Sequence, residues 1–285
     1  MSFDPGEKRG TLLANDAAKA DKEERLVLGG MARWDGLDLF GPNFMSVAYR
    51  HRGTIHVRVE PSSIWKPKNP AVQRVSRWPV LRSIFFWGRL ILQVVGSIWT
   101  LLFFAATLVA LWLFVRLMEL GSGEGALGGV FAFFAAFPIL PVLLLFFAAM
   151  KFSPIGRYHG AEHKAVAAYE EHGEATLEAA RRSSRIHPRC GTNILSYIIL
   201  AALLDPLIAW WGYAVLQFIL ISEAWFVFGK TRPSIAVGNF LQIYFTTTEP
   251  RRAELEVAVE SLKELLHAEE ESAGGGKLTR APARF

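Results

Sequence analysis

Long apolar runs dominate the pattern of hydrophobic and polar positions in the middle of the chain. Residues 96–118 carry a single charge near the end of the run, and residues 126–150 carry none. Each run is long enough to cross about 30 Å of hydrocarbon as a helix. A third apolar region, residues 193–230, is interrupted at Asp205-Pro206, which predicts two further helices joined by a tight turn. The pattern therefore predicts a mainly α membrane protein with about four transmembrane helices.

An alternating pattern before the first run predicts a small β element. Residues 44–51 and 54–60 alternate apolar and polar side chains, and Arg52-Gly53 stands between them, as is typical of a β-hairpin. The apolar face of the second strand carries Ile55, Val57 and Val59. We expect this hairpin to lie on the cytoplasmic side together with several cytoplasmic helices.

Three helices outside the apolar runs are predicted from their end signals. Ser153-Pro154 and Gly173 mark the start and the stop of a helix over 154–172, and Thr176 is expected to cap a short helix after it. A terminal amphipathic helix has one apolar stripe made of Leu255, Val259, Leu262 and Leu266. We expect the threonines at 246–248 to cap this terminal helix.

These patterns divide the chain into seven predicted segments. They are a polar disordered leader (1–26), a β element with an interfacial helix (27–95), the first two transmembrane helices (96–150), a cytoplasmic segment with a candidate metal site (151–192), the third and fourth transmembrane helices (193–230), a cytoplasmic helical region (231–270) and a flexible tail (271–285). The leader lacks the apolar core that a secretory signal needs, so we expect no cleavage there.

Charge placement orients the predicted spans. The chain has a formal net charge of +5, and its basic residues gather before the first run, after the second and after residue 230. Because basic loops stay in the cytoplasm, both termini are expected there, in a multi-pass protein of the cell inner (plasma) membrane. We expect membrane lipid and a further protein partner or substrate, but no nucleic acid. Cys190 is the sole cysteine, which excludes an internal disulfide.

The polar segment RYHGAEHKAVAAYEEHG, residues 157–173, carries the first candidate chemistry. His159 and His163 are four residues apart, so on a helix both imidazoles can reach one ion from the same face. With Glu162 they form H-x-x-E-H, the order-reversed zinc-hydrolase motif, in which the glutamate handles the proton of a water. Glu170 shares the stripe, but it lies about 10 Å further along the helix axis, too far to bind the same ion.

A second pair of candidate ligands follows in IHPRCGTN. His187 and Cys190 form an H-x-x-C pair, and we expect the short helix capped by Thr176 to fold the chain back so that the two pairs meet. Zinc is the expected ion because these nitrogen and sulfur donors suit it, although another divalent metal fits the same spacing.

Three functional interpretations of these residues remain open, beside one in which the histidines only form hydrogen bonds at a junction of helix and membrane. In the first, the protein is a zinc-dependent hydrolase or peptidase with the two α-helical histidines as ligands, Glu162 as general base and one position open to water. The third ligand would then be His187, Cys190 or Glu223, an acid within an apolar run. In the second, His187 and Cys190 close a structural zinc site of a non-catalytic membrane scaffold or assembly factor. In the third, Cys190 is a nucleophile with His187 as its base.

Several of these motifs also resemble a known family. RYHGAEHK with AYE, then SRIHPRCGTN, then FLQIYFTTTEP with ELEVAVESL resemble the YqhQ-like family of bacterial membrane proteins, whose function is uncharacterised and which are labelled predicted metal-dependent enzymes. The resemblance runs over residues 28–262 and implies a polytopic membrane protein. The signature residues that it carries over are His159, Glu162, His163, His187, Arg189, Cys190, Gln242, Thr246, Thr247 and Glu249. The N-terminal stretch departs from the family pattern but keeps paired glycines at 29 and 30.

Overall fold

The computed structural model organises the chain into two compact units. It describes residues 25–26, 28–62, 69–95, 109, 112–114, 116–117, 119–121, 125–137, 139–208 and 214–273. The first unit combines three segments, 1–63, 150–187 and 246–285, and the second combines 64–149 and 188–245. Segments far apart in the sequence therefore fold together within each unit.

A four-stranded antiparallel sheet forms the first layer of the first unit. Its strands are β1 (Gly29–Ala32), β2 (Gly36–Phe40), β3 (Phe44–His51) and β4 (Thr54–Pro61), in the order β1-β2-β3-β4. The predicted hairpin is confirmed as β3 and β4. Its two turn residues, Arg52 and Gly53, have φ of 49° and 86°, as a tight two-residue hairpin turn requires.

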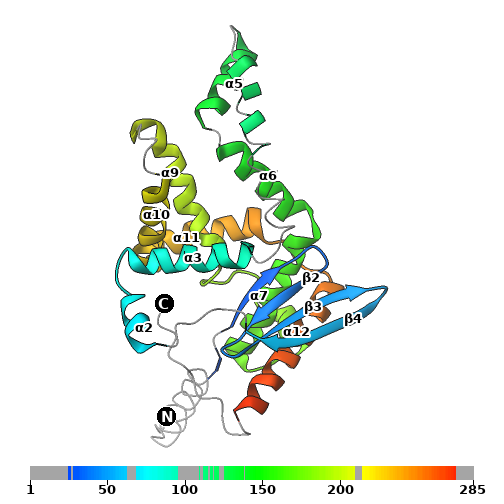
Figure 1. The fold of residues 1–285 in the computed structure, drawn as a ribbon. Helices are drawn as coiled ribbons and strands as arrows, with labels where there is room; N and C mark the ends of the chain where they lie inside the picture. Colours follow the sequence, from blue (N-terminus) through cyan, green and yellow to red (C-terminus); the bar gives the residue numbers. More distant parts are fainter. Residues whose placement is uncertain are drawn as a thin grey trace, which may run out of the picture. The chain divides into compact units, whose positions relative to one another are not determined.

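Three helices accompany this sheet in the first unit, as Figure 1 shows for α7 and α12. They are α7 (Pro154–His172), α8 (Leu177–Arg182) and α12 (Arg252–Ser272). The predicted apolar stripe of α12 is confirmed, because Leu255, Val259 and Leu262 are buried. They share one core with Leu37 and Leu39 of β2, both fully buried. Burying each leucine stabilises the fold by about 2 kcal/mol. The helices therefore cover the face of the sheet that carries these leucines.

The predicted helix ends are confirmed for α7 and α8, and the predicted cap of α12 is wrong. The hydroxyl oxygen of Ser153 accepts from the Ile155 N–H at 3.2 Å, and that of Thr176 accepts from the Ala179 N–H at 3.2 Å. At the start of α12 the N–H of Arg251 instead donates to the Glu254 carboxylate at 2.9 Å. The threonines at 246–248 precede this cap and make other contacts, since Thr246 ends η3 and α12 begins only at Arg252.

The remaining helices have lengths that overturn the prediction of four transmembrane helices. They are α2 (Pro70–Val75), α3 (Leu81–Val95), α5 (Ala126–Ala136), α6 (Ile139–Phe152), α9 (Leu195–Ile208), α10 (Ala214–Phe228) and α11 (Arg232–Leu241), with short turns η1 (Gly191–Ile194) and η3 (Gln242–Thr246). None of the described helices is both long enough and apolar enough to span a membrane by itself. Leu140–Phe152 and Pro154–His172 meet the criterion only as a pair, which is bent by 68° at its break.

The prediction of four transmembrane helices is therefore wrong, and the breaks in the helices explain why. The run 126–150 divides into α5 and α6 because Phe137, which precedes a proline, leaves the helical region with φ of −125° and ψ of 64°. The predicted turn at Asp205-Pro206 is also absent, since α9 continues to Ile208. Most of the first predicted span, residues 96–108, lies outside the described residues.

Candidate metal centre

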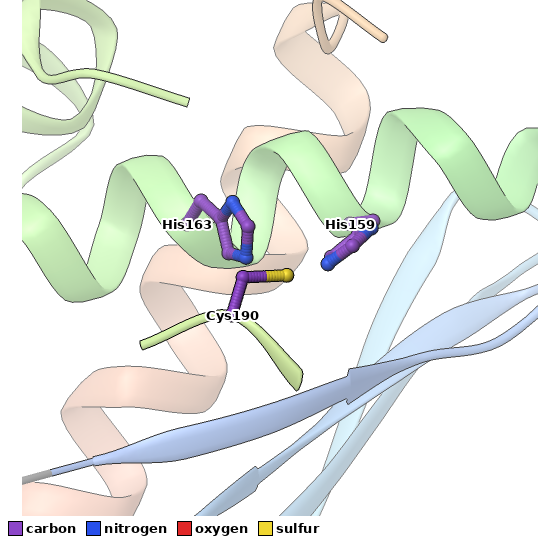
Figure 2. A group of neighbouring side chains, drawn as sticks. All are labelled: His159, His163 and Cys190. Atoms are coloured by element: carbon purple, nitrogen blue, oxygen red, sulfur yellow. The ribbon is translucent and has the colours of Figure 1, made fainter. Parts of the chain in front are cut away.

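The H-x-x-E-H motif lies on the buried face of α7. The side chains of His159 and His163 are 7% and 3% exposed, and their ring centroids are 4.4 Å apart. Figure 2 shows both rings projecting from successive turns of the same helix. The spacing therefore places two imidazoles side by side in a site that water hardly reaches.

Backbone carbonyls orient both rings. The Nδ1 of His159 lies 2.8 Å from the carbonyl oxygen of Thr246, and the Nδ1 of His163 lies 2.7 Å from that of Arg185. A carbonyl oxygen can only accept, so each Nδ1 carries the hydrogen and each Nε2 carries the lone pair of the neutral ring. Histidines that bind a metal are held in this way, with one ring nitrogen donating to a fixed acceptor.

The environment also keeps the two imidazoles neutral. Burial lowers the pKa of His159, and it lowers the pKa of His163 well below the ordinary value, with the neighbouring His159 acting in the same direction. Metal binding requires the deprotonated ring, so no proton has to be displaced from these two nitrogens near neutral pH.

Cys190 supplies a third donor. One nitrogen from each of His159 and His163 and the Sγ of Cys190 lie within 4.8 Å of one another, and all three residues are buried (Figure 2). Two imidazole nitrogens and one thiolate form a donor set that suits zinc. The three residues could therefore hold a zinc ion. Three protein donors are enough for a zinc site that leaves its fourth position open.

His187 is near this group but belongs to a different pair. Its Nε2 lies 3.1 Å from Oε2 of Glu170, and its ring centroid lies 5.7 Å from that of His163. Because a carboxylate accepts, Nε2 of His187 donates to Glu170. His187 is not one of the three residues whose donor atoms lie mutually close. Glu170 thus orients a histidine here.

Glu162 is the most unusual group of the centre. Its side chain is 6% exposed, and among the described residues its carboxyl has no hydrogen bond or ion pair. Burial raises the pKa of Glu162 to about 8. The carboxyl lies against Gly30 of β1, where a Cβ atom would come within 2.4 Å of its Cδ and Oε1. The glycine therefore provides the space that the carboxyl fills.

Glu223, predicted as a third ligand or an acid within the membrane, has other partners. Its carboxylate accepts from the N–H of Val80 at 3.0 Å and from Nε of Arg82 at 2.9 Å, and it also accepts from the Ser83 hydroxyl. The hydrogen bond from Arg82 lowers the pKa of Glu223. This ion pair accounts for an acid on the apolar helix α10 without a metal.

The other motif residues make structural contacts around the centre. The carbonyl of Thr246 orients His159, and the carbonyl of Thr247 accepts from Nη1 of Arg185 at 3.1 Å. Glu249 lies 3.1 Å from Nζ of Lys164. Gln242 of the second unit donates to Asn193 at 2.9 Å, whereas Arg189 is exposed.

Sequence reasoning missed the two carbonyl acceptors and the lysine that holds the segment before one of them. Nζ of the buried Lys164 donates to the carbonyls of Arg181 and Ser183 at 3.1 and 3.0 Å, which fixes the segment just before Arg185. A carbonyl belongs to every residue, so no side-chain pattern could indicate these acceptors. The lysine directly after the motif histidine was the one signal available.

Comparisons with known proteins agree with these motifs. The model of the family described as "Protein of unknown function (DUF1385)" matches residues 86–268. The uncharacterized protein YqhQ of Bacillus subtilis (strain 168) is 34% identical over 130 residues, which cover 40% of this chain and 41% of that protein. The match thus spans less than half of the length of this relative. No solved structure matches the chain. Because the family model covers more than half of the chain and includes all the candidate ligands, the protein belongs to the DUF1385 family.

Proposed function

We propose that the protein is a metal-dependent hydrolase in which His159, His163 and Cys190 bind zinc and Glu162 is the general base. One observation carries this proposal: a carboxyl that is buried and has no partner among the described residues stands directly before a histidine whose ring is already oriented. A buried acid without a partner is costly to the fold, so we infer that its position serves chemistry.

The number of donors favours catalysis over a closed site. Structural zinc sites use four protein ligands, whereas catalytic sites use three and leave one position for water or substrate. Here three donors lie mutually close, and His187 is not among them. When bound, the ion would supply Lewis-acid chemistry, polarising a substrate carbonyl and making a water more acidic.

The chain's own residues would then handle the proton. Glu162 takes a proton from water as the water oxygen attacks the carbonyl carbon, and it returns that proton to the leaving group when the bond to the carbonyl breaks. With its pKa raised to about 8, the carboxyl can both take up and release a proton at mildly alkaline pH. The buried walls around His159 and His163 exclude bulk water from the reaction.

Metal content and hydrolysis, measured together, test the proposal. We expect wild-type protein purified without chelators to contain about one zinc per chain and to hydrolyse fluorogenic casein or p-nitrophenyl acetate. His159→Ala, His163→Ala and Cys190→Ala should lose the metal, because each removes a donor. Glu162→Gln should keep the metal but lose at least about a hundredfold in turnover.

Two controls make the result decisive. Glu260→Gln changes an exposed glutamate of α12 and should alter neither property. A wild-type protein without metal, or a Glu162→Gln variant as active as wild type, would refute the hydrolase.

A closed structural zinc site is the second candidate, and the orientation of His187 favours it. Its Nε2 donates to the carboxylate of Glu170, as one ring nitrogen of a metal-binding histidine commonly does, and its ring lies near that of His163. In that case His187→Ala should release zinc and lower the unfolding temperature as much as His163→Ala does, while Glu162→Gln should have no effect on function. If His187→Ala keeps its zinc, the closed site is excluded.

A further inference from the structure

Strand β1 leaves one row of backbone groups open at the edge of the sheet. It is the first strand in the order β1-β2-β3-β4 and pairs only with β2 among the described strands. The N–H of Arg33 donates to the carbonyl of Gly36 at 2.8 Å, which sets the alternation along the pair. Since hydrogen-bonded positions alternate in antiparallel pairs, Met31 points its backbone groups toward β2, and Gly30 and Ala32 point theirs away from it.

This open edge is accessible. Gly29, Gly30 and Met31 are exposed, and within the described part of the chain no hydrogen bond reaches the outward groups of Gly30 and Ala32. The two glycines have no side chains that would hinder a second backbone from approaching. Met31 and Trp34, with exposed fractions of 54% and 64%, add apolar surface at the same end of the sheet.

The helix beneath the edge carries the candidate metal centre. β1 lies beside α7. Successive residues of a helix are rotated by about 100°, so around α7 the core residues Ala161 and Ala165 are followed by Glu162 and then by His159 and His163. Glu162 touches the strand at Gly30. The two histidines therefore lie past β1 on the side of its open edge. A strand added at that edge would run over them.

We propose that β1 is the binding edge for an extended peptide, which adds to the sheet as a fifth strand above Glu162 and the two histidines. This inference rests on the proposed hydrolase and names its substrate class as peptides or unfolded protein segments. An open strand offers an N–H and a C=O at every second residue, a spacing of about 7 Å that an extended polypeptide matches. The peptide carbonyl next to Gly30 would then face the general base.

Amide hydrogen exchange on the full-length, zinc-loaded Glu162→Gln protein tests the site without requiring turnover. The probe is a blocked heptapeptide of alternating valine and threonine, which favours an extended conformation. We expect the peptide to slow exchange at the amides of Gly30 and Ala32 and to leave that of Met31 unchanged. The opposite edge, β4, is the internal control, since Ile55 and Val57 have the same outward groups but are not beside α7.

Two chemical controls sharpen the test. N-methylation of the alternate peptide amides that face β1 should weaken binding about tenfold, because it removes their hydrogen bonds. N-methylation of the amides that face away from β1 should have little effect. Gly30→Ala should weaken binding because the new methyl group displaces the Glu162 carboxyl, whereas Gly88→Ala on α3 meets no atom within 4 Å and should bind as wild type does.

The outcomes separate this inference from the proposed function. Protection at β4, equal effects of both N-methylated peptides, or no protection at all would overturn the peptide edge even if casein or ester hydrolysis is observed. Protection at Gly30 and Ala32 in a protein whose metal-loaded wild type hydrolyses nothing would support the peptide edge and refute the hydrolase.

Discussion

At the scale of single residues, two buried glutamates have opposite surroundings. The Glu162 carboxyl has no partner among the described residues, whereas the Glu269 carboxylate accepts from the Asn43 N–H at 2.7 Å, from Nδ2 of Asn43 at 2.8 Å and from the Phe44 N–H at 2.8 Å. Burial without hydrogen bonds destabilises a fold, and burial with three hydrogen bonds does not. The contrast supports the role proposed for Glu162 and gives Glu269 a structural one.

This contrast predicts opposite effects of the same substitution. Glu162→Gln should leave the free energy of unfolding of the metal-free protein unchanged or raise it, because a neutral amide replaces an acid that burial disfavours. Glu269→Gln should lower it by about 2 kcal/mol, because charge-assisted hydrogen bonds to the turn before β3 are weakened. Urea unfolding followed by circular dichroism measures both, and a larger loss for Glu162→Gln would contradict the assignment.

The sequence was sufficient for part of the site. The four-residue spacing of His159 and His163 predicts a shared face on any helix, and Cys190 was a candidate because it lies soon after in the chain. The acceptors that orient the rings are carbonyls of Thr246 and Arg185, whose role depends on where the backbone passes. Only the folded chain could reveal them.

At the scale of elements, Lys164 connects α7 to the segment that orients His163. Its side chain is buried and holds the carbonyls of Arg181 and Ser183. Lys164→Met should lower zinc affinity about tenfold, because the Arg185 carbonyl loses its fixed position. Competition with a fluorescent chelator measures the change. Lys263→Met on α12 removes an exposed lysine, so its zinc affinity should match wild type.

Another element-scale prediction concerns the start of α3. Arg82 of α3 and the N–H of Val80 just before it donate to the Glu223 carboxylate of α10, and the hydrogen bond from Arg82 lowers the pKa of Glu223 from its ordinary value. The stabilisation is therefore complete above pH 4.5 and is lost as the pH falls through the lower folded value. Glu223→Gln should cost about 2 kcal/mol at pH 7 and progressively less in acid. Unfolding curves from pH 7 to 3 test this, with Glu260→Gln as the exposed control.

Sequence patterns predicted some elements well and others badly, for identifiable reasons. The hairpin and α7 have strong local signals, namely alternation and end caps, and both were confirmed. Strands β1 and β2 have four and five residues with glycines among them, so their alternation was too short to recognise. The apolar runs were misassigned because hydropathy averages over breaks, such as the one at Phe137.

At the scale of the whole molecule, each unit is assembled from separated segments with its own internal contacts. We therefore expect local destabilisation to stay largely within one unit. Glu269→Gln should speed amide exchange in 28–62, 150–187 and 251–273, and Glu223→Gln should speed it in 69–95 and 214–245. Exchange mapped by mass spectrometry on both variants tests this. Equal acceleration of all these segments in either variant would show one cooperative unit instead.

The 87-residue separation between His159 and the carbonyl of Thr246 has a consequence for biosynthesis. A ribosome makes the chain from its N-terminus, so both histidines of α7 emerge well before the acceptor that fixes one of them. Cys190 also emerges before that acceptor. During translation His159, His163 and Cys190 are present on a nascent chain in which the His159 ring is not yet oriented. We therefore expect tight binding of zinc only after the last quarter of the protein has been made. Metal loading is thus expected to follow translation rather than accompany it.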